Sequence, residues 1–147
     1  MHYWRFLDYW SEGNDRKNLI EEWYRNEGEE LQAAFDTALN ELAGTEDWRD
    51  LGWFKVLTGK HTGLCEIKID IPENPVVPGR KPPATHYRPV GFIKREPGEF
   101  ISGEFVLLLG CKKSGRSYEP PNAFDLALDL KRKFQEEGRG RIHAHSF

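Results

Sequence analysis

The chain has 147 residues, a length that fits one domain, and 38% of them are hydrophobic, with aromatic residues to build a core. No apolar run approaches the roughly 18 residues of a membrane helix, and the N-terminus lacks the basic head and apolar stretch of a secretory signal, so we expect a cytoplasmic protein. Cys65 and Cys111 lie in expected strands, which favours buried free thiols over a disulfide. Without a CxxC pair, His and Cys at zinc spacing or a Gly-rich phosphate loop, the sequence predicts no metal site and no cofactor.

The net charge of −3 hides an uneven distribution. Residues 1–50 carry five Lys or Arg and thirteen Asp or Glu, which is −8, whereas residues 51–118 carry eleven and six, which is +5. Residues 119–147 balance at five and five. The acidic N-terminal part is typical of a solvated helical surface, and a basic middle is what contact with a phosphate backbone requires.

The N-terminal third is expected to hold one strand and two helices. Residues 3–9 are rich in aromatics, which predicts a strand, and residues 13–15 then break the pattern and offer a helix cap. A short helix follows, with an apolar face made by Leu19, Ile20, Trp23 and Tyr24. After Gly28, steps of three and four predict a second helix, with Leu31, Ala34, Phe35, Ala38, Leu39 and Leu42 on one stripe and its end at Ala43-Gly44. Two helices joined by so few residues should form an antiparallel hairpin.

The remainder is expected to be three strands and a closing helix. After a connector over residues 48–60, Leu64 to Ile71 alternate as one strand with a buried face and a mostly polar face. A proline-rich loop spans residues 72–86, and further strands are predicted at Tyr87 to Arg95 and Glu104 to Gly110. Residues 112–117 form a basic loop, and the last helix starts after Pro120-Pro121-Asn122.

This order predicts an α+β fold, in which the N-terminal strand and the helical hairpin pack on a small, mainly antiparallel sheet with a C-terminal helix. Residues 1–137 would form a single domain, and residues 138–147 a loose tail.

Three stretches resemble a known family. They are Phe54 to Lys68, which reads FKVLTGKHTGLCEIK; His86-Tyr87-Arg88; and Phe105 to Lys113, which reads FVLLLGCKK and is followed by proline and a helix. In order and spacing these stretches resemble the RelE/ParE superfamily of toxins from type II toxin–antitoxin modules, closest to the HigB-like, phage-related branch. The likeness covers about residues 50–135. It implies a RelE-like fold.

The resemblance also implies an activity: a metal-free endoribonuclease that cuts messenger RNA on the ribosome and is restrained by a cognate antitoxin. In that reaction the 2′-hydroxyl of the RNA attacks the adjacent phosphate, so the enzyme must accept a proton, offset charge on the phosphoryl oxygens and protect the leaving oxygen. Two alternatives stay open, because fold does not fix function. One is a ParE-like toxin that binds a protein such as gyrase, and the other is an inactive interaction domain with the same fold.

By the resemblance, the candidate catalytic residues are Lys68, Arg88, Lys113 and Tyr118. Lys68 and Arg88 would offset phosphate charge. The alternatives are a surface lysine and an ion pair of Arg88 with Glu66 or Asp70. Lys113 would act at the leaving side, and the ring of Tyr118 could carry an unstacked base.

Further candidates flank these positions. Lys60, Lys112 and Arg116 are candidates for binding RNA phosphates, although a solvated turn is the ordinary use of such charges. The candidates for proton transfer are Glu66, His61 and His86. Glu66 also suits an ion pair, and a loop histidine is usually just exposed. The functional prediction depends on Lys68, Arg88 and Lys113 lying on one concave side of the sheet. Scatter of the three over separate surfaces, or burial of Arg88 in a closed internal ion pair, would contradict it.

Overall fold

A mixed sheet and three helices make up the part of the chain that the computed structural model describes, which is residues 3–11, 17–72, 78–79, 83–94, 103–137 and 142–146. The elements run in the order β1 (Trp4–Tyr9), α1 (Leu19–Asn26), α2 (Glu29–Ala43), β2 (Phe54–Val56), the 3-10 turn η1 (Gly59–His61), β3 (Cys65–Ile67), β4 (Ile69–Pro72), β5 (Ala84–Lys94), β6 (Gly103–Ser114), β7 (Ser117–Glu119), α3 (Ala123–Glu137) and β8 (Ile142–Ala144). The predicted α+β class is confirmed. Among the described helices, none combines the length and the apolar character that crossing a membrane would need.

The strands lie in the order β2-β3-β5-β6-β1-β8, with β4 also paired to β5 and β7 to β6. The strands that follow residue 60 pair antiparallel with one another, as predicted, and β1 lies parallel to β6. Because β6 pairs with β5 along one side and with β1 and β7 along the other, it is the central strand. Its apolar run from Phe105 to Leu109 is accordingly buried.

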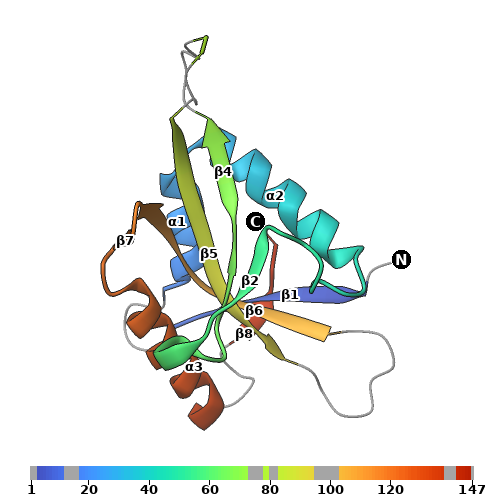
Figure 1. The fold of residues 1–147 in the computed structure, drawn as a ribbon. Coiled ribbons are helices and arrows are strands. Elements are labelled where there is room, and N and C mark those ends of the chain that lie inside the picture. The colour runs from blue at the N-terminus through green and yellow to red at the C-terminus, as the bar shows by residue number, and fades with distance from the viewer. Residues whose placement is uncertain are drawn as a thin grey trace.

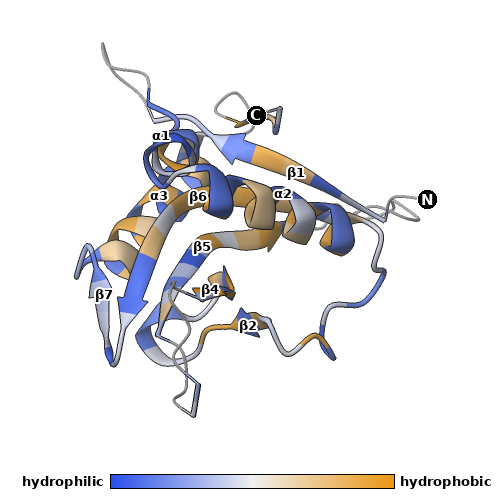
Figure 2. Ribbon diagram, turned by 90° about the horizontal axis from the view of Figure 1, so that it is seen from above, coloured by the Kyte–Doolittle hydropathy of each residue, from blue (hydrophilic) through white to orange (hydrophobic). Residues whose placement is uncertain are grey.

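Helices cover both faces of this sheet (Figure 1). On one face, α1 and α2 pack against a core that includes Trp23, Phe35, Ile67 and Phe105. On the other face, α3 packs against a second core, which includes Val90, Phe92, Leu109, Phe124 and Phe134. We refer to these as the α1–α2 face and the α3 face. Figure 2 shows that the apolar middle of β6 gives way to hydrophilic residues at its end beside β7.

The two N-terminal helices begin where local chemistry favours it. The Asn18 side chain accepts a hydrogen bond of 3.0 Å from the Glu21 N–H and so caps α1. The caps predicted at residues 13–15 lie outside the described residues. Gly28, with φ of +89°, turns the chain into α2, a conformation in which glycine avoids a steric penalty.

The strand predicted over residues 64–71 is two strands, β3 and β4, separated at Lys68. The Lys68 N–H donates to the Trp53 carbonyl at 2.7 Å. Trp53 precedes the short strand β2, which lies within the segment predicted to be a connector. Position 67 faces Pro89, which has no N–H to donate, so the ladder with β5 is interrupted there. β5 in turn begins at Ala84, inside the predicted proline-rich loop.

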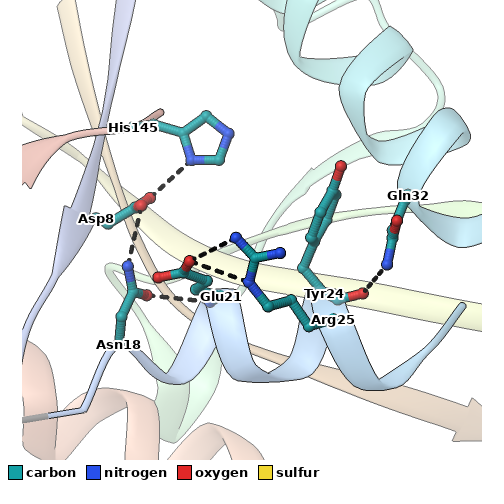
Figure 3. Close-up of polar contacts among 7 residues, drawn as sticks. All are labelled: Asp8, Asn18, Glu21, Tyr24, Arg25, Gln32 and His145. Atoms are coloured by element: carbon teal, nitrogen blue, oxygen red, sulfur yellow. Dashed lines mark hydrogen bonds and ion pairs between the residues drawn. The ribbon is translucent and has the colours of Figure 1, made fainter. Parts of the chain in front are cut away.

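The predicted basic loop and loose tail also differ from the structure. β6 continues to Ser114 and forms a hairpin with β7, so Lys112 and Lys113 lie in a strand. Residues 142–144 of the expected tail form β8, which pairs with β1. Next to it, the buried Asp8 carboxylate contacts His145 Nδ1 at 2.9 Å and accepts from Asn18 Nδ2 at 3.1 Å (Figure 3). This network ties the C-terminal segment to β1 and α1.

Candidate functional site

Four polar residues form a row across four strands. The register pairs Asp70 of β4 with His86 of β5, His86 with Lys113 of β6, and Lys113 with Tyr118 of β7. Side chains of directly paired residues in neighbouring strands point to the same face of the sheet. Tyr118 packs in the core under α3, so the row lies on the α3 face. We call these four residues the polar row.

A second row of paired positions runs alongside the polar row. Arg88 pairs with Cys111 of β6. On the other side of β5, Glu66 pairs with Val90 and Ile69 pairs with Tyr87. The same register continued between these pairs places Lys68 opposite Arg88. Residues 67 and 69 pack in the α1–α2 core, and Lys68 between them therefore points to the α3 face. By this register Lys68 shares a face with Arg88 and Lys113, and Lys68 also borders the groove between α2 and β4.

No helix among the described residues lies in front of this part of the α3 face. Figure 1 shows β4 and β5 running past α3, with α1 and α2 behind them. A hollow of about 400 Å³ lies over the strand ends, lined among others by His86, Lys113, Ser114, Ser117 and Tyr118. The polar row is therefore open to a ligand along most of its length.

Arg88 lies beneath the surface rather than on it. Its side chain is only 7% exposed, and its Nη1 donates to Asp70 Oδ1 and to the Tyr87 carbonyl, both at 2.8 Å. Its Nε has no hydrogen-bond partner. The ion pair with Asp70, named above as the alternative to phosphate contact, is thus present. Arg88 contributes positive charge from below the row and presents no open guanidinium fork.

Asp70 holds two donors at once. The same Oδ1 that receives Arg88 lies 2.8 Å from His86 Nδ1. Burial raises the pKa of Asp70, but the hydrogen bonds and charges of Arg88 and His86 outweigh it, so the net pKa lies below its usual value. Asp70 is therefore ionised at neutral pH. The sequence analysis named Asp70 only as a partner for Arg88. Its position two residues after Lys68, on the polar face of the alternating strand, is the signal that could have identified it.

Glu66 is buried below the polar row. Only 1% of the residue is exposed, and its Oε2 has no hydrogen-bond partner. The strand face predicted to be mostly polar is thus closed at this residue, which lies close to Cys111 and Tyr118 on the α3 face. Cys111 is also buried on this face, and burial together with the Glu66 charge raises the pKa of its thiol to about 12. As it lies, Glu66 does not reach a substrate in the hollow.

Tyr118 is a packed phenol at the end of the polar row. Its ring meets Phe124 edge-on at 4.4 Å between centroids, and Lys113 Nζ lies 5.7 Å from the ring centre. Burial, and then the Glu66 charge, raise the pKa of the Tyr118 hydroxyl, which keeps it protonated. Phe124 and Lys113 already contact the ring of Tyr118. This arrangement favours a role for the Tyr118 hydroxyl as a hydrogen-bond donor over a role for the ring in stacking on a base.

The other sequence candidates lie outside the polar row. Lys112 points to the opposite face, where its Nζ lies 2.9 Å from Glu27 Oε2. His61 Nε2 is 3.0 Å from Asp125 Oδ1 at the start of α3. Lys60 is exposed beside that pair and helps His61 to lower the pKa of Asp125. Arg116 is exposed in the turn between β6 and β7.

Fold and site together define an α+β protein with a charged row on an uncovered part of its sheet. Within the described residues, no three His, Cys, Asp or Glu side chains gather as a metal site would require. No protein-family model matches the chain, and no curated protein or solved structure matches it either.

Proposed function

We propose that this chain is a metal-free endoribonuclease with a RelE-like fold, the toxin of a type II toxin–antitoxin module that cuts messenger RNA on the ribosome. The observation that carries the proposal is that Arg88 and Lys113 lie on one sheet face, with His86 and Tyr118 around the hollow and Lys68 at the strand break opposite Arg88. A phosphate in this hollow would meet fixed positive charge and hydroxyl donors, which is what cleavage by an RNA 2′-hydroxyl needs.

Each cation has a distinct place in this proposal. Lys113 lines the hollow and has no carboxylate partner among the described residues, so its ammonium is available to a phosphoryl oxygen. Lys68 lies one strand further along, and Arg88 adds charge from beneath. The protonated Tyr118 hydroxyl can donate to the phosphate or to the leaving oxygen.

The balance of charge sets the expected strength of binding. The three cations share their face with the carboxylates of Glu66 and Asp70, which leaves one positive charge before His86 is counted. Contacts with phosphate dominate the affinity of most nucleic-acid-binding proteins. We therefore expect modest binding to free RNA and a need for the ribosome to present the substrate.

Two adjacent lysines supply a matched test. Lys112 and Lys113 are neighbours in β6, equal in size and charge, and both border the hollow. The Lys112 ammonium is held by Glu27 on the other face, whereas Lys113 pairs with Tyr118 in the polar row. In a translating extract, wild type and Lys112→Ala should cut the message, and Lys113→Ala should leave most of it intact. An uncut message with the wild-type protein, or equal losses in both variants, contradicts the proposal.

A second function is favoured by a neighbouring groove, which Lys68 and Asp70 also border. An apolar groove of about 690 Å³ lies between α2 and β4, with Ala34, Ala38, Trp53 and Ile71 among its lining residues. Such a groove suits contact with a protein, either the cognate antitoxin or a target. Intact message together with gyrase inhibition would favour a ParE-like toxin, and neither effect would favour an interaction domain. Growth arrest on induction, relieved by a neighbouring gene, would identify the antitoxin.

A further inference from the structure

The proposed ribonuclease reaction, on which the following rests, must move a proton from the ribose 2′-hydroxyl. Asp70 Oδ1 lies 2.8 Å from His86 Nδ1. A carboxylate can only accept a hydrogen bond, and the lowered pKa of Asp70 keeps it ionised. The proton of a neutral His86 therefore sits on Nδ1. This leaves the lone pair on Nε2, at the far side of a ring whose side chain is 41% exposed.

The surroundings of His86 place this lone pair beside the other groups of the site. His86 is the direct cross-strand neighbour of Lys113, and both line the hollow with Tyr118. The charged or titratable groups around it, among the described residues, are Asp70 on β4, Arg88 on β5, Lys112 and Lys113 on β6, and Tyr118 and Glu119 on β7. Of these, only Asp70 contacts the ring directly.

We propose that His86 is the general base of this site and that Asp70 is the residue that positions it. His86 Nε2 takes the proton of the ribose 2′-hydroxyl as O2′ forms a bond to phosphorus. The bond from phosphorus to the 5′ oxygen breaks, and this oxygen takes a proton from water. A 2′,3′-cyclic phosphate and a 5′-hydroxyl end result, and the imidazolium returns its proton to solvent. Asp70 stabilises that imidazolium, and its second donor, Arg88, fixes the carboxylate against the sheet.

The chain offers a matched control in a second His–Asp pair. His61 Nε2 contacts Asp125 Oδ1 at 3.0 Å, but this pair lies at the start of α3, and His61 packs on the ring of Phe124 instead of lining the hollow. His61→Ala thus removes an imidazole with a carboxylate partner and leaves the polar row intact. Circular dichroism of each variant checks that it is folded.

The test is single-turnover cleavage of messenger RNA on programmed ribosomes between about pH 6 and pH 8.5, a range that brackets the ordinary pKa of histidine. The wild-type rate should fall towards low pH, because an imidazolium cannot accept a proton. His86→Ala should lower the rate about 10²-fold or more and should also abolish its fall towards low pH, the acidic limb of the profile. Asp70→Asn should lose less rate than His86→Ala, because the base is kept but the carboxylate that orients its ring is gone. His61→Ala should match the wild type.

The outcomes separate the two proposals. No cleavage by wild-type protein overturns the ribonuclease function and this assignment with it. Cleavage that survives His86→Ala with an unchanged pH profile overturns only the assignment, as does loss of the acidic limb in His61→Ala. Nitrogen-15 NMR of the histidine rings gives a readout that needs no RNA: we expect the Nδ1–H tautomer for neutral His86, and its loss in Asp70→Ala, which removes the acceptor. An Nε2–H tautomer of His86 in the wild type would overturn its assignment as general base, even if the enzyme cleaves RNA.

Discussion

The indole of Trp23 lies directly on Gly110, so closely that a Cβ at Gly110 would stand 1.9 Å from Trp23 Cδ2. Gly110 sits in β6, and Trp23 is on the buried face of α1, so this contact sets how near the helix approaches the central strand. We expect Gly110→Ala to force α1 away from the sheet and to cost about 1–3 kcal/mol in the free energy of unfolding. Urea unfolding followed by tryptophan fluorescence measures it.

Gly52→Ala is the control for that substitution. A Cβ at Gly52 would meet nothing within 4 Å, so this variant should unfold close to the wild-type midpoint. Equal midpoints for Gly110→Ala and the wild type would show that α1 can shift without cost.

The two cysteines should resist modification in the folded protein. Both are free and buried, and burial raises the pKa of Cys65 to about 11 and, with the Glu66 charge, that of Cys111 to about 12. Because the thiolate is the reactive form, we expect a disulfide reagent at pH 8 to react about 10²-fold more slowly with the folded than with the unfolded chain. Rapid reaction of either thiol in native buffer would contradict this burial.

The same thiols predict a loss of stability in alkali. A thiol with a raised pKa in the folded state keeps its proton there after the unfolded chain, with a pKa near 8.5, has begun to lose it. The stabilisation is complete below about pH 8.5 and decreases as the pH rises towards the folded values of about 11 and 12. Melting temperatures between pH 7 and about pH 10 should therefore fall less steeply in Cys111→Ala than in the wild type.

Asp8 and His145 should be coupled in stability. The buried Asp8 carboxylate has His145 on one oxygen and Asn18 on the other (Figure 3). Asp8→Ala removes both of these contacts and should cost about 1.5–3 kcal/mol, the range for hydrogen bonds to a charged group. A double-mutant cycle with His145→Ala, by urea unfolding, should give a coupling energy above about 0.5 kcal/mol. Strict additivity would mean that the C-terminal segment does not depend on Asp8.

Salt should report the number of phosphates that Lys113 neutralises. For single-stranded RNA, the logarithm of the binding constant falls by about 0.7 per unit of log salt concentration for each phosphate contact. Lys113→Ala should lower this slope by about that amount, and Lys112→Ala should leave it unchanged, because the Lys112 ammonium is already paired with Glu27. Titrations of a labelled oligonucleotide at several salt concentrations decide this, and a slope that is flat in the wild type would count against phosphate binding.

The elements that sequence reasoning predicted have local causes. The stripe of Leu31, Phe35, Leu39 and Leu42 predicts α2 because residues three and four apart share one side of a helix. Alternation over residues 64–71 likewise marks strand conformation. The three-residue strands β2, β7 and β8 escaped prediction, because so short a segment carries no periodic signal and becomes a strand only by pairing with a distant partner.

By itself, the sequence determined the α+β class, the two buried thiols and which residue types are available for chemistry on the basic middle segment. The tertiary structure alone decided their partners: that Arg88 is held by Asp70, that Glu66 is buried, and that Lys113 but not Lys112 belongs to the polar row. The physical reason is that helix periodicity and side-chain alternation arise within a segment. Strand register, in contrast, joins residues far apart in the chain, and a shift of one residue moves every side chain to the other face.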